Sequence, residues 1–124
     1  MEYKLLIDGQ WGGSGTPLEV KNKYSGQTVG VVNTATKEDL NKAIDAAQRA
    51  REIMAEMPAY KRADILLRAA YLLRDNVEDM AKTIAAEAGK ALKFARAEAE
   101  RAVSTFTFAA EEAKRLHGET IPLD

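Results

Sequence analysis

At 124 residues the chain has the length of one domain, and a chain of this size buries roughly two thirds of its unfolded surface on folding. Its 18 lysines and arginines nearly balance its 19 aspartates and glutamates, so the charge does not favour nucleic acid or an anionic membrane as a partner. The sequence has no cysteine, which excludes disulfides, thiolate catalysis and cysteine-ligated metals in these residues and makes the cytoplasm the expected compartment.

The first stretch of the chain predicts a β-hairpin. The run from Tyr3 to Ile7 is rich in strand-forming residues, and Asp8-Gly9 supplies the positive φ angles of a tight turn before Gln10 and Trp11. This apolar run is too short for a secretory signal peptide, so we expect no leader here.

A second hairpin is predicted from residues 18–21 and 28–32, because residues 24–27 between them contain a glycine suited to the turn. Trp11 and Tyr24 are expected to anchor the two hairpins on helices. An isolated two-stranded hairpin is marginally stable, and the sequence offers no third strand. The strands are therefore expected to lean on a part of the protein that this chain lacks.

Helical periodicity begins at Thr36. Thr36 and Asp39 have the spacing of a capping box, with Asp in place of the usual Glu, and they predict a helix over residues 37–56. Apolar residues recur at steps of three and four along this helix, which predicts one buried stripe. The stripe comprises Leu40, Ala43, Ile44, Ala47, Ala50 and Met54.

The stretch KRADILLRAAYLLRD, residues 61–75, is the most apolar part of the sequence. At helical spacing its apolar residues point in nearly every direction, so it predicts a core helix that is covered on most sides and around which the other elements pack. Pro58 suits the start of this helix, because a proline there loses no intrahelical hydrogen bond.

Two further helices are predicted. Asn76 is expected to cap the third helix, and Gly89 is expected to end it in a left-handed conformation. The fourth helix is expected to run from about Ala91 until Gly118 stops it. One face of this helix carries mostly small residues, which allows close approach to a neighbouring helix: Leu92, Ala95, Ala99, Ala102, Val103, Phe106, Ala109 or Ala110, Ala113 and Leu116.

The predicted fold class is α+β and mostly α, with two β-hairpins followed by four helices. Residues 1–124 are interpreted as a single segment, with the hairpins in residues 1–33 and the helices in residues 34–117. No internal repeat or linker divides it.

Two glycine segments resemble parts of phosphate-binding loops but lack the rest of the motif. Residues 12–15 are glycine-rich, but Thr16-Pro17 leads into an extended run, where a phosphate cradle needs a helix N-terminus. Gly89-Lys90 lacks the glycine that the motif needs at Ile84 and the hydroxyl that it needs at Ala91. Residues 12–15 are therefore interpreted as a plain loop, and Lys90 as a lysine at a helix boundary.

The remaining polar candidates also favour structural roles. His117 is the only histidine and has neither cysteine nor a second imidazole with which to build a common metal site. Glu111-Glu112 are neighbours, so on a helix they point about 100° apart and cannot act as an acid–base pair on one substrate. Glu98 lies close to the apolar face of the last helix beside Arg96 and Arg101, which favours a salt bridge or a capping contact over catalysis.

Six segments in this order resemble the start of the aldehyde dehydrogenase superfamily. They are LLIDGQW from Leu5, NKYSGQTVGVV from Asn22, TATKEDLNKAIDAAQRA from Thr34, KRADILLRAAYLL from Lys61, EAGK from Glu87 and FAAEEAKRLHGETIPLD from Phe108. The resemblance covers the whole chain. The stretch from Arg96 through Arg101 to the GETIP segment at Gly118 most resembles the branch that handles lactaldehyde, glyceraldehyde phosphate or succinate semialdehyde.

Two positions depart from the family pattern. Ala91 follows Gly89-Lys90 where the family often has proline, and residues 23–26 replace a commoner Asn-Pro-x-Thr-Gly turn. Neither departure is expected to disturb the fold.

The resemblance implies an N-terminal piece of a larger α/β enzyme that uses NAD or NADP. In the full-length enzyme a cysteine thiolate would attack the aldehyde, hydride would pass to the cofactor, and a glutamate would activate water to release an acid. All three parts are expected beyond residue 124. No catalytic, cofactor-binding or metal-ligating residue is therefore assigned in this chain, and the chain alone is expected to bind no cofactor and to be inactive.

Three functional hypotheses remain open from the sequence. The chain is the N-terminal fragment of an aldehyde dehydrogenase, a self-standing helical interaction module without chemistry, or a structural subunit that completes a partner. In the first case apolar surface is exposed, so the isolated chain is expected to self-associate, through its alanine-rich last helix above all, and the full-length enzyme to form a homo-oligomer.

Overall fold

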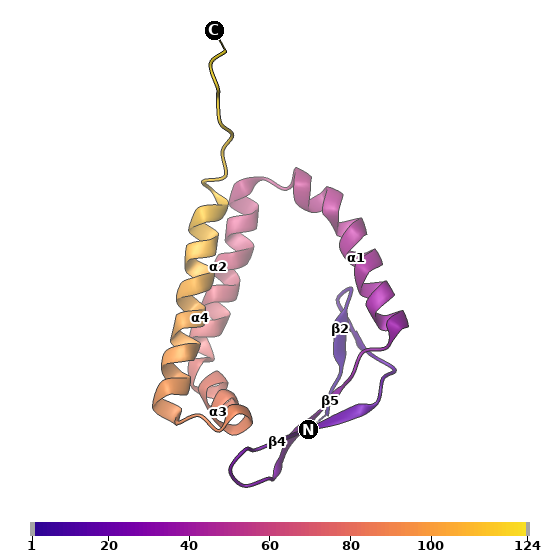
Figure 1. Cartoon of the computed structure of the whole chain (residues 1–124). Helices are drawn as coiled ribbons and strands as arrows, with labels where there is room; N and C mark the ends of the chain where they lie inside the picture. The colour runs from indigo at the N-terminus through magenta and orange to yellow at the C-terminus, as the bar shows by residue number, and fades with distance from the viewer. Residues whose placement is uncertain (1, 124) are drawn as a thin grey trace.

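The computed structural model describes residues 2–123 and confirms an α+β fold in which strands precede helices (Figure 1). The strands are β1 Glu2–Tyr3, β2 Leu5–Ile7, β3 Gln10–Gly12, β4 Pro17–Lys21 and β5 Thr28–Asn33. The helices are α1 Lys37–Glu56, α2 Ala59–Asp75, α3 Val77–Ala88 and α4 Leu92–Ala113. None of the helices within residues 2–123 is long and apolar enough to cross a membrane.

The first predicted hairpin is confirmed. Strands β2 and β3 pair antiparallel, with Leu6 opposite Trp11. Asp8 and Gly9 connect them with φ angles of 52° and 73°, which is the left-handed conformation that a two-residue hairpin turn requires.

The second predicted hairpin is also confirmed, but it belongs to a larger sheet. Strands β4 and β5 pair antiparallel, and β1 adds to the other edge of β5 in parallel, with Tyr3 opposite Val32. The prediction that the chain has no third strand for this sheet was therefore wrong. A parallel pair joins segments far apart in sequence and has no turn between them, so no local signal revealed it.

The start of α1 is as predicted. The Thr36 hydroxyl accepts from the Asp39 backbone N–H at 3.2 Å, and the Asp39 carboxylate accepts from the Thr36 backbone N–H at 3.0 Å, which completes the capping box. Asn76, in contrast, does not cap α3 with its side chain. Its Nδ2 donates to the Leu72 carbonyl at 2.8 Å, so the side chain completes the end of α2 instead.

The predicted end of α3 is confirmed, whereas the predicted end of α4 was wrong. Gly89 has φ 67° and ψ 22°, and its N–H donates to the Ala85 carbonyl at 3.0 Å. Helix α4 ends at Ala113, before Gly118, and the residues that follow extend away from the bundle (Figure 1). These residues have no neighbouring element to pack on, and tertiary packing supplies most helical stability in proteins.

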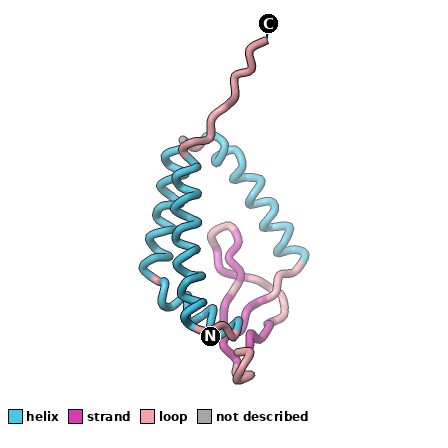
Figure 2. Tube along the Cα trace, turned by 60° about the vertical axis from the view of Figure 1, so that its left-hand side comes forward, coloured by secondary structure: helices cyan, strands magenta, loops and turns pink. Residues whose placement is uncertain are grey.

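Helix α4 packs along α2 and α3, and α2 and α4 lie side by side in both views (Figures 1 and 2). The buried apolar residues of the described chain are all alanines: Ala63, Ala70, Ala81, Ala95, Ala99 and Ala110. Small side chains at the contact let helix axes approach closely. The predicted close approach of α4 is confirmed, and its partners are within the chain.

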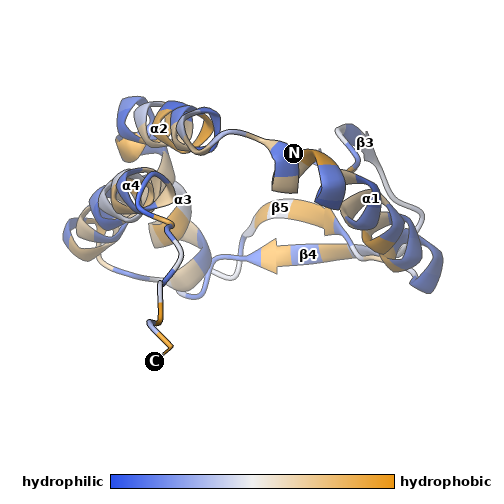
Figure 3. Cartoon of the chain, turned by 90° about the horizontal axis from the view of Figure 1, so that it is seen from above, coloured by the Kyte–Doolittle hydropathy of each residue, from blue (hydrophilic) through white to orange (hydrophobic). Residues whose placement is uncertain are grey.

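The predicted surroundings of α2 and α1 were wrong. Only one side of α2 is covered by α4, and Leu72 on α2 is 67% exposed. Helix α1 packs on β2 and stands apart from α2, α3 and α4 (Figures 1 and 3). On the stripe predicted to be buried, Leu40 and Ile44 are 57% and 52% exposed. The periodicity identified apolar faces correctly, but no described element of this chain covers them.

Candidate functional site

The glycine-rich loop of residues 12–15 lies against the N-terminus of α1. The Ser14 backbone N–H and hydroxyl both lie 3.4 Å from Asp39 Oδ2, although the two residues are 25 positions apart. A helix N-terminus therefore lies beside the loop in space, although none follows it in the sequence. Long-range folding brings it there, and no local signal could have shown this.

Asp39 already supplies a negative charge between the loop and the N-terminus of α1. Its buried carboxylate accepts from the Thr36 N–H at 3.0 Å and from the Thr36 hydroxyl at 2.9 Å, as well as facing Ser14. The Thr36 N–H, then the Thr36 hydroxyl, hold the pKa of Asp39 below its usual range against the opposing effect of burial. Because the Asp39 carboxylate already uses these donors and carries a negative charge, it disfavours a second anion at this place.

A shallow groove of about 330 Å³ runs between the β2–β3 hairpin and α1. Its lining comprises Leu5, Ile7, Asp8, Gln10, Trp11, Gly12, Gly13, Asp39, Lys42, Asp45 and Arg49. Arg49 pairs with Asp8 at 2.8 Å and so ties the hairpin to the helix. Within residues 2–123 no group of His, Asp and Glu side chains is arranged to hold a metal ion. The groove combines paired charges of both signs and offers no catalytic pair.

Lys90 and Glu98 form an ion pair across the turn between α3 and α4. The hydrogen bond from Lys90 is the main cause that lowers the pKa of Glu98. The predicted salt bridge of Glu98 is thus confirmed, with Lys90 as the partner in place of Arg96 or Arg101. Lys90, which belongs to the glycine segment Gly89-Lys90, is therefore used in a structural contact.

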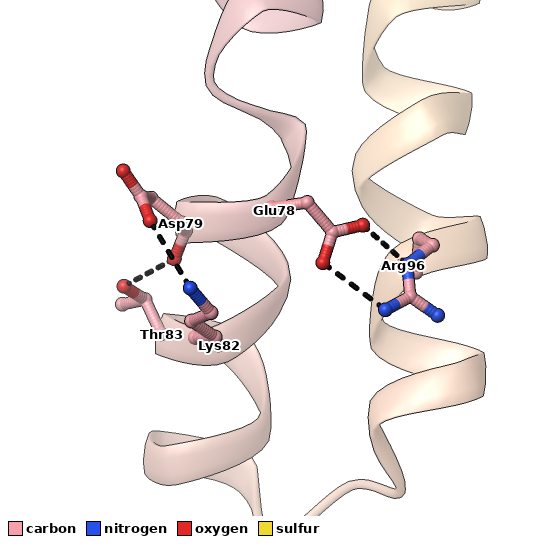
Figure 4. A network of polar contacts seen from close by, with 5 residues as sticks. All are labelled: Glu78, Asp79, Lys82, Thr83 and Arg96. Carbon is pink, nitrogen blue, oxygen red and sulfur yellow. Dashed lines mark hydrogen bonds and ion pairs between the residues drawn. The ribbon is translucent and has the colours of Figure 1, made fainter.

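Arg96 pairs instead with Glu78 and links α4 to α3 (Figure 4). The guanidinium donates twice, Nε to Oε1 at 2.5 Å and Nη2 to Oε2 at 3.0 Å, which is the two-pronged geometry that arginine favours with carboxylates. This hydrogen bonding is the main cause that lowers the pKa of Glu78. Asp79 and Lys82 approach to 3.6 Å on the outer side of α3. These contacts stabilise the packing of α3 against α4, and none of their residues lines the groove between the β2–β3 hairpin and α1.

The residues weighed at the end of α4 are also not brought together. Glu112 pairs with Arg115 at 2.9 Å, as the sequence analysis expected for a surface charge. His117 lies beyond the helix, where its Nδ1 is 2.5 Å from the Arg115 carbonyl oxygen. It is exposed in the extended tail beyond α4.

The chain as a whole nevertheless matches a known protein family. A profile described as "Aldehyde dehydrogenase family" matches residues 11–124. The chain belongs to the aldehyde dehydrogenase family. Its expected similarity to an N-terminal segment of that family is confirmed.

Several aldehyde dehydrogenases match nearly all of this chain. A 3-sulfolactaldehyde dehydrogenase from Priestia megaterium is 39% identical over 99% of the chain, and a lactaldehyde dehydrogenase from Methanocaldococcus jannaschii is 36% identical over 97%. The crystal structure of aldehyde dehydrogenase 21 from Physcomitrella patens, in complex with the reaction product succinate, is 40% identical and superposes on 99% of the chain with a TM-score of 0.93. The chain spans about a quarter of the length of each of these proteins: 25%, 26% and 26%.

The two glycine segments of the described chain do not fit the phosphate groups of a nicotinamide dinucleotide, the cofactor that the resemblance implies. The donors beside the loop of residues 12–15 are used by Asp39, and Lys90 is engaged by Glu98. Neither glycine segment therefore provides a free cradle for phosphate groups.

Proposed function

We propose that this chain is the N-terminal quarter of an NAD(P)-dependent aldehyde dehydrogenase, and that the whole enzyme oxidises a small aldehyde to a carboxylic acid. The observation that carries the proposal is the family match over residues 11–124 together with a superposition on 99% of the chain at a TM-score of 0.93. Fold alone does not establish activity, and here the similarity extends to 40% sequence identity.

The names of the relatives support a 2-hydroxyaldehyde as the substrate class. Lactaldehyde and 3-sulfolactaldehyde, which name two of the matching enzymes, both carry a hydroxyl on the carbon next to the aldehyde. No residue of this chain is proposed to touch that substrate. The chain is proposed to act as a scaffold for the rest of the enzyme and to be inactive by itself, because it has no cysteine to act as the nucleophile. A cytoplasmic location agrees with the same lack of cysteine.

The proposal is tested with a chimera. The segment of the Priestia megaterium enzyme that matches this chain is replaced by the present 124 residues, and reduction of NAD and NADP is measured with lactaldehyde and 3-sulfolactaldehyde. The chimera is expected to be active. The chain alone and the Priestia enzyme lacking its segment serve as controls and are expected to be inactive. A chimera that folds with the same melting profile as its parent but oxidises neither aldehyde would contradict the proposal.

Self-association of the isolated chain is proposed on the same basis. The alanines of α4 that were expected to pair with another copy, Ala95, Ala99 and Ala110, are buried against α2 and α3. Open apolar surface lies on α1, on the uncovered side of α2 and also on α4, where Phe94 and Phe108 are 64% and 66% exposed. Exposed patches of this kind promote association. Sedimentation velocity at micromolar concentration is expected to show a species larger than a monomer, whereas a stable monomer that binds no hydrophobic dye would contradict this proposal.

A further inference from the structure

The turn between β2 and β3 has the sequence Asp8-Gly9, and no other Asp or Asn of the chain is followed by glycine. The carboxyl group of an aspartate can react with the backbone nitrogen of the next residue, and the side chain of that residue normally hinders the approach. Glycine has no Cβ and leaves the approach open. The turn is therefore the place in this sequence where such a rearrangement of the backbone is least hindered.

The structure leaves both reacting groups accessible. The Asp8 side chain is 64% exposed, and a Cβ built on Gly9 would meet nothing within 4 Å, so open space surrounds the turn. Ile7 and Gln10 pair across the turn, and the backbone hydrogen bonds described for residues 2–123 outside the strand ladders and helices do not use the Gly9 N–H. No hydrogen bond of that kind has to break before the nitrogen can react.

The hairpin that carries the turn offers little resistance to local opening. Strands β2 and β3 have three residues each and form a sheet of two strands. A two-stranded hairpin is marginally stable by itself, and elements with few contacts open at low free energy. Opening gives Asp8 the backbone and side-chain rotation that ring closure with the next nitrogen requires.

One contact opposes this rotation. Arg49 Nη2 on α1 lies 2.8 Å from Asp8 Oδ2, in the ion pair that ties the hairpin to the helix. The pair holds one carboxylate oxygen on α1, whereas ring closure requires the carboxyl group to turn toward the Gly9 nitrogen and to lose an oxygen. Because the pair is exposed, its effect on the rate is a modest factor.

We propose that Asp8-Gly9 is a site of spontaneous isomerisation, restrained by the ion pair of Asp8 with Arg49. The Gly9 nitrogen forms a bond to Asp8 Cγ as the bond from Cγ to one oxygen breaks. That oxygen leaves as water with the Gly9 N–H proton and a proton from solvent, which closes a succinimide ring. Water then opens the ring at the Asp8 backbone carbonyl carbon, which gives isoaspartate, or at Cγ, which restores aspartate. Nothing is oxidised or reduced.

Isoaspartate changes both the turn and its tie to the helix. The backbone then runs through Cβ and Cγ of residue 8, which adds one backbone atom between Ile7 and Gln10, and the free carboxylate is attached directly to Cα. A two-residue turn has a fixed length and needs set positive φ angles, so the pairing of β2 with β3 is weakened. Arg49 loses the carboxylate that it binds, and the hairpin is released from α1. This inference does not depend on the proposed function.

The test measures uptake of oxygen-18 at Asp8 in the 124-residue chain, kept for several weeks near neutral pH in water enriched in that isotope. Each opening of the succinimide adds one oxygen from solvent. Trypsin, used afterwards in ordinary water, releases residues 5–21, a peptide in which Asp8 is the only Asp or Asn. Chromatography separates its isoaspartyl and aspartyl forms, and labelled isoaspartate is expected in this peptide above that in every other peptide of the digest.

Substitutions test each part of the proposal. Arg49→Gln is expected to raise the rate of labelling about 1.5- to 5-fold, the factor that an exposed ion pair supplies. Arg51→Gln is the matched control, because Arg51 is exposed on the same helix and makes no ion pair within residues 2–123. Asp8→Glu should stop the labelling, since its carboxyl group would have to close a larger ring.

The free peptide of residues 5–21 gives the rate without restraint and is expected to be labelled faster than the folded chain. Labelling of the unchanged chain no greater than that of Asp8→Glu would overturn the proposal. Equal rates in Arg49→Gln and Arg51→Gln, or a folded chain labelled as fast as the free peptide, would overturn the restraint assigned to Arg49.

Discussion

Substitution of Gly15 by alanine tests how the glycine-rich loop meets the sheet. A Cβ at Gly15 would lie 2.0 Å from the Thr34 carbonyl oxygen and 2.6 Å from the carbonyl carbon, both backbone atoms. Such contacts do not occur in folded proteins, so the two segments must separate by about 1 Å or more. Three polar contacts join them here: Thr34 N–H to the Thr16 carbonyl at 3.1 Å, the Thr34 hydroxyl to the same carbonyl at 2.8 Å, and the two hydroxyls at 3.3 Å.

The expected cost follows from these contacts. A hydrogen bond of this kind contributes about 0.5–1.5 kcal/mol, so loss of the three lowers the free energy of unfolding by about 1.5–4.5 kcal/mol, with about 3 kcal/mol as the central value. In a domain of this size that corresponds to a fall in melting temperature of roughly 10 °C. The effect should be larger in the strands than in the helices, because the helix pair α2–α4 packs independently of this loop.

The assay follows both parts during a thermal melt. Fluorescence of Trp11, which lies in β3 close to the loop, reports on the strands, and far-ultraviolet circular dichroism reports on the helices. Gly12→Ala is the matched control, since Gly12 has no left-handed φ and its Cβ would meet nothing within 4 Å. If Gly15→Ala shifts the fluorescence midpoint no more than Gly12→Ala does, the close approach at Thr34 is not a feature of the folded chain.

Three further predictions concern a helix end, a cap and the cofactor. Gly89→Ala is expected to lower the free energy of unfolding by about 1 kcal/mol, because a Cβ is strained at φ 67° and would also lie 3.1 Å from the Lys23 side chain. Ala88→Gly should lower it only through the poorer helix propensity of glycine. Urea titration compares the two variants, and equal midpoints would contradict the strain at Gly89. Asp39 has a lowered pKa in the folded chain, so the stability that it contributes is present above its ordinary pKa of 3.8 and is lost as the pH falls through the lower folded pKa. Asp39→Asn should remove that part of the acid-induced loss of stability. Thermal melts between about pH 2 and pH 5 compare the variant with the unchanged chain. Calorimetric titration of the isolated chain with NAD and NADP is expected to show no heat of binding, and micromolar affinity for either would refute the conclusion drawn from Asp39 and Lys90.

The features predicted well from the sequence are those whose cause lies within a few residues. The capping box at Thr36, the turn at Asp8-Gly9 and the left-handed Gly89 each depend on atoms at most four positions away, and all three are confirmed. The bounds of α1 follow from the first of these and from Pro58. Local hydrogen bonding and allowed φ angles therefore account for much of the secondary structure.

The features that the sequence did not reveal depend on distant partners. The parallel pairing of β1 with β5, and the meeting of the loop at Ser14 with Asp39, join segments with no turn between them. Periodicity also showed which side of α1 is apolar without showing that this side would stay open. The spacing of apolar residues along a helix indicates that one face needs cover, and it carries no information on whether the same chain supplies it.

The two halves of the chain therefore differ in what supports them. Helices α2, α3 and α4 have alanine at every buried apolar position, and small side chains bring little apolar area. The stability of this part therefore depends on close backbone packing, reinforced between α3 and α4 by the ion pair of Glu78 with Arg96. Helix α1 stands apart from the other described helices and is held by its packing on β2, its capping box and the Arg49–Asp8 pair, which is exposed and contributes little. An external apolar partner would therefore add more stability at α1, where Leu40 and Ile44 are more than half exposed, than at the alanine face of α4, which is already buried. Substitutions on the apolar side of α1 thus distinguish an independent module from one part of a larger enzyme better than substitutions on the alanine face do.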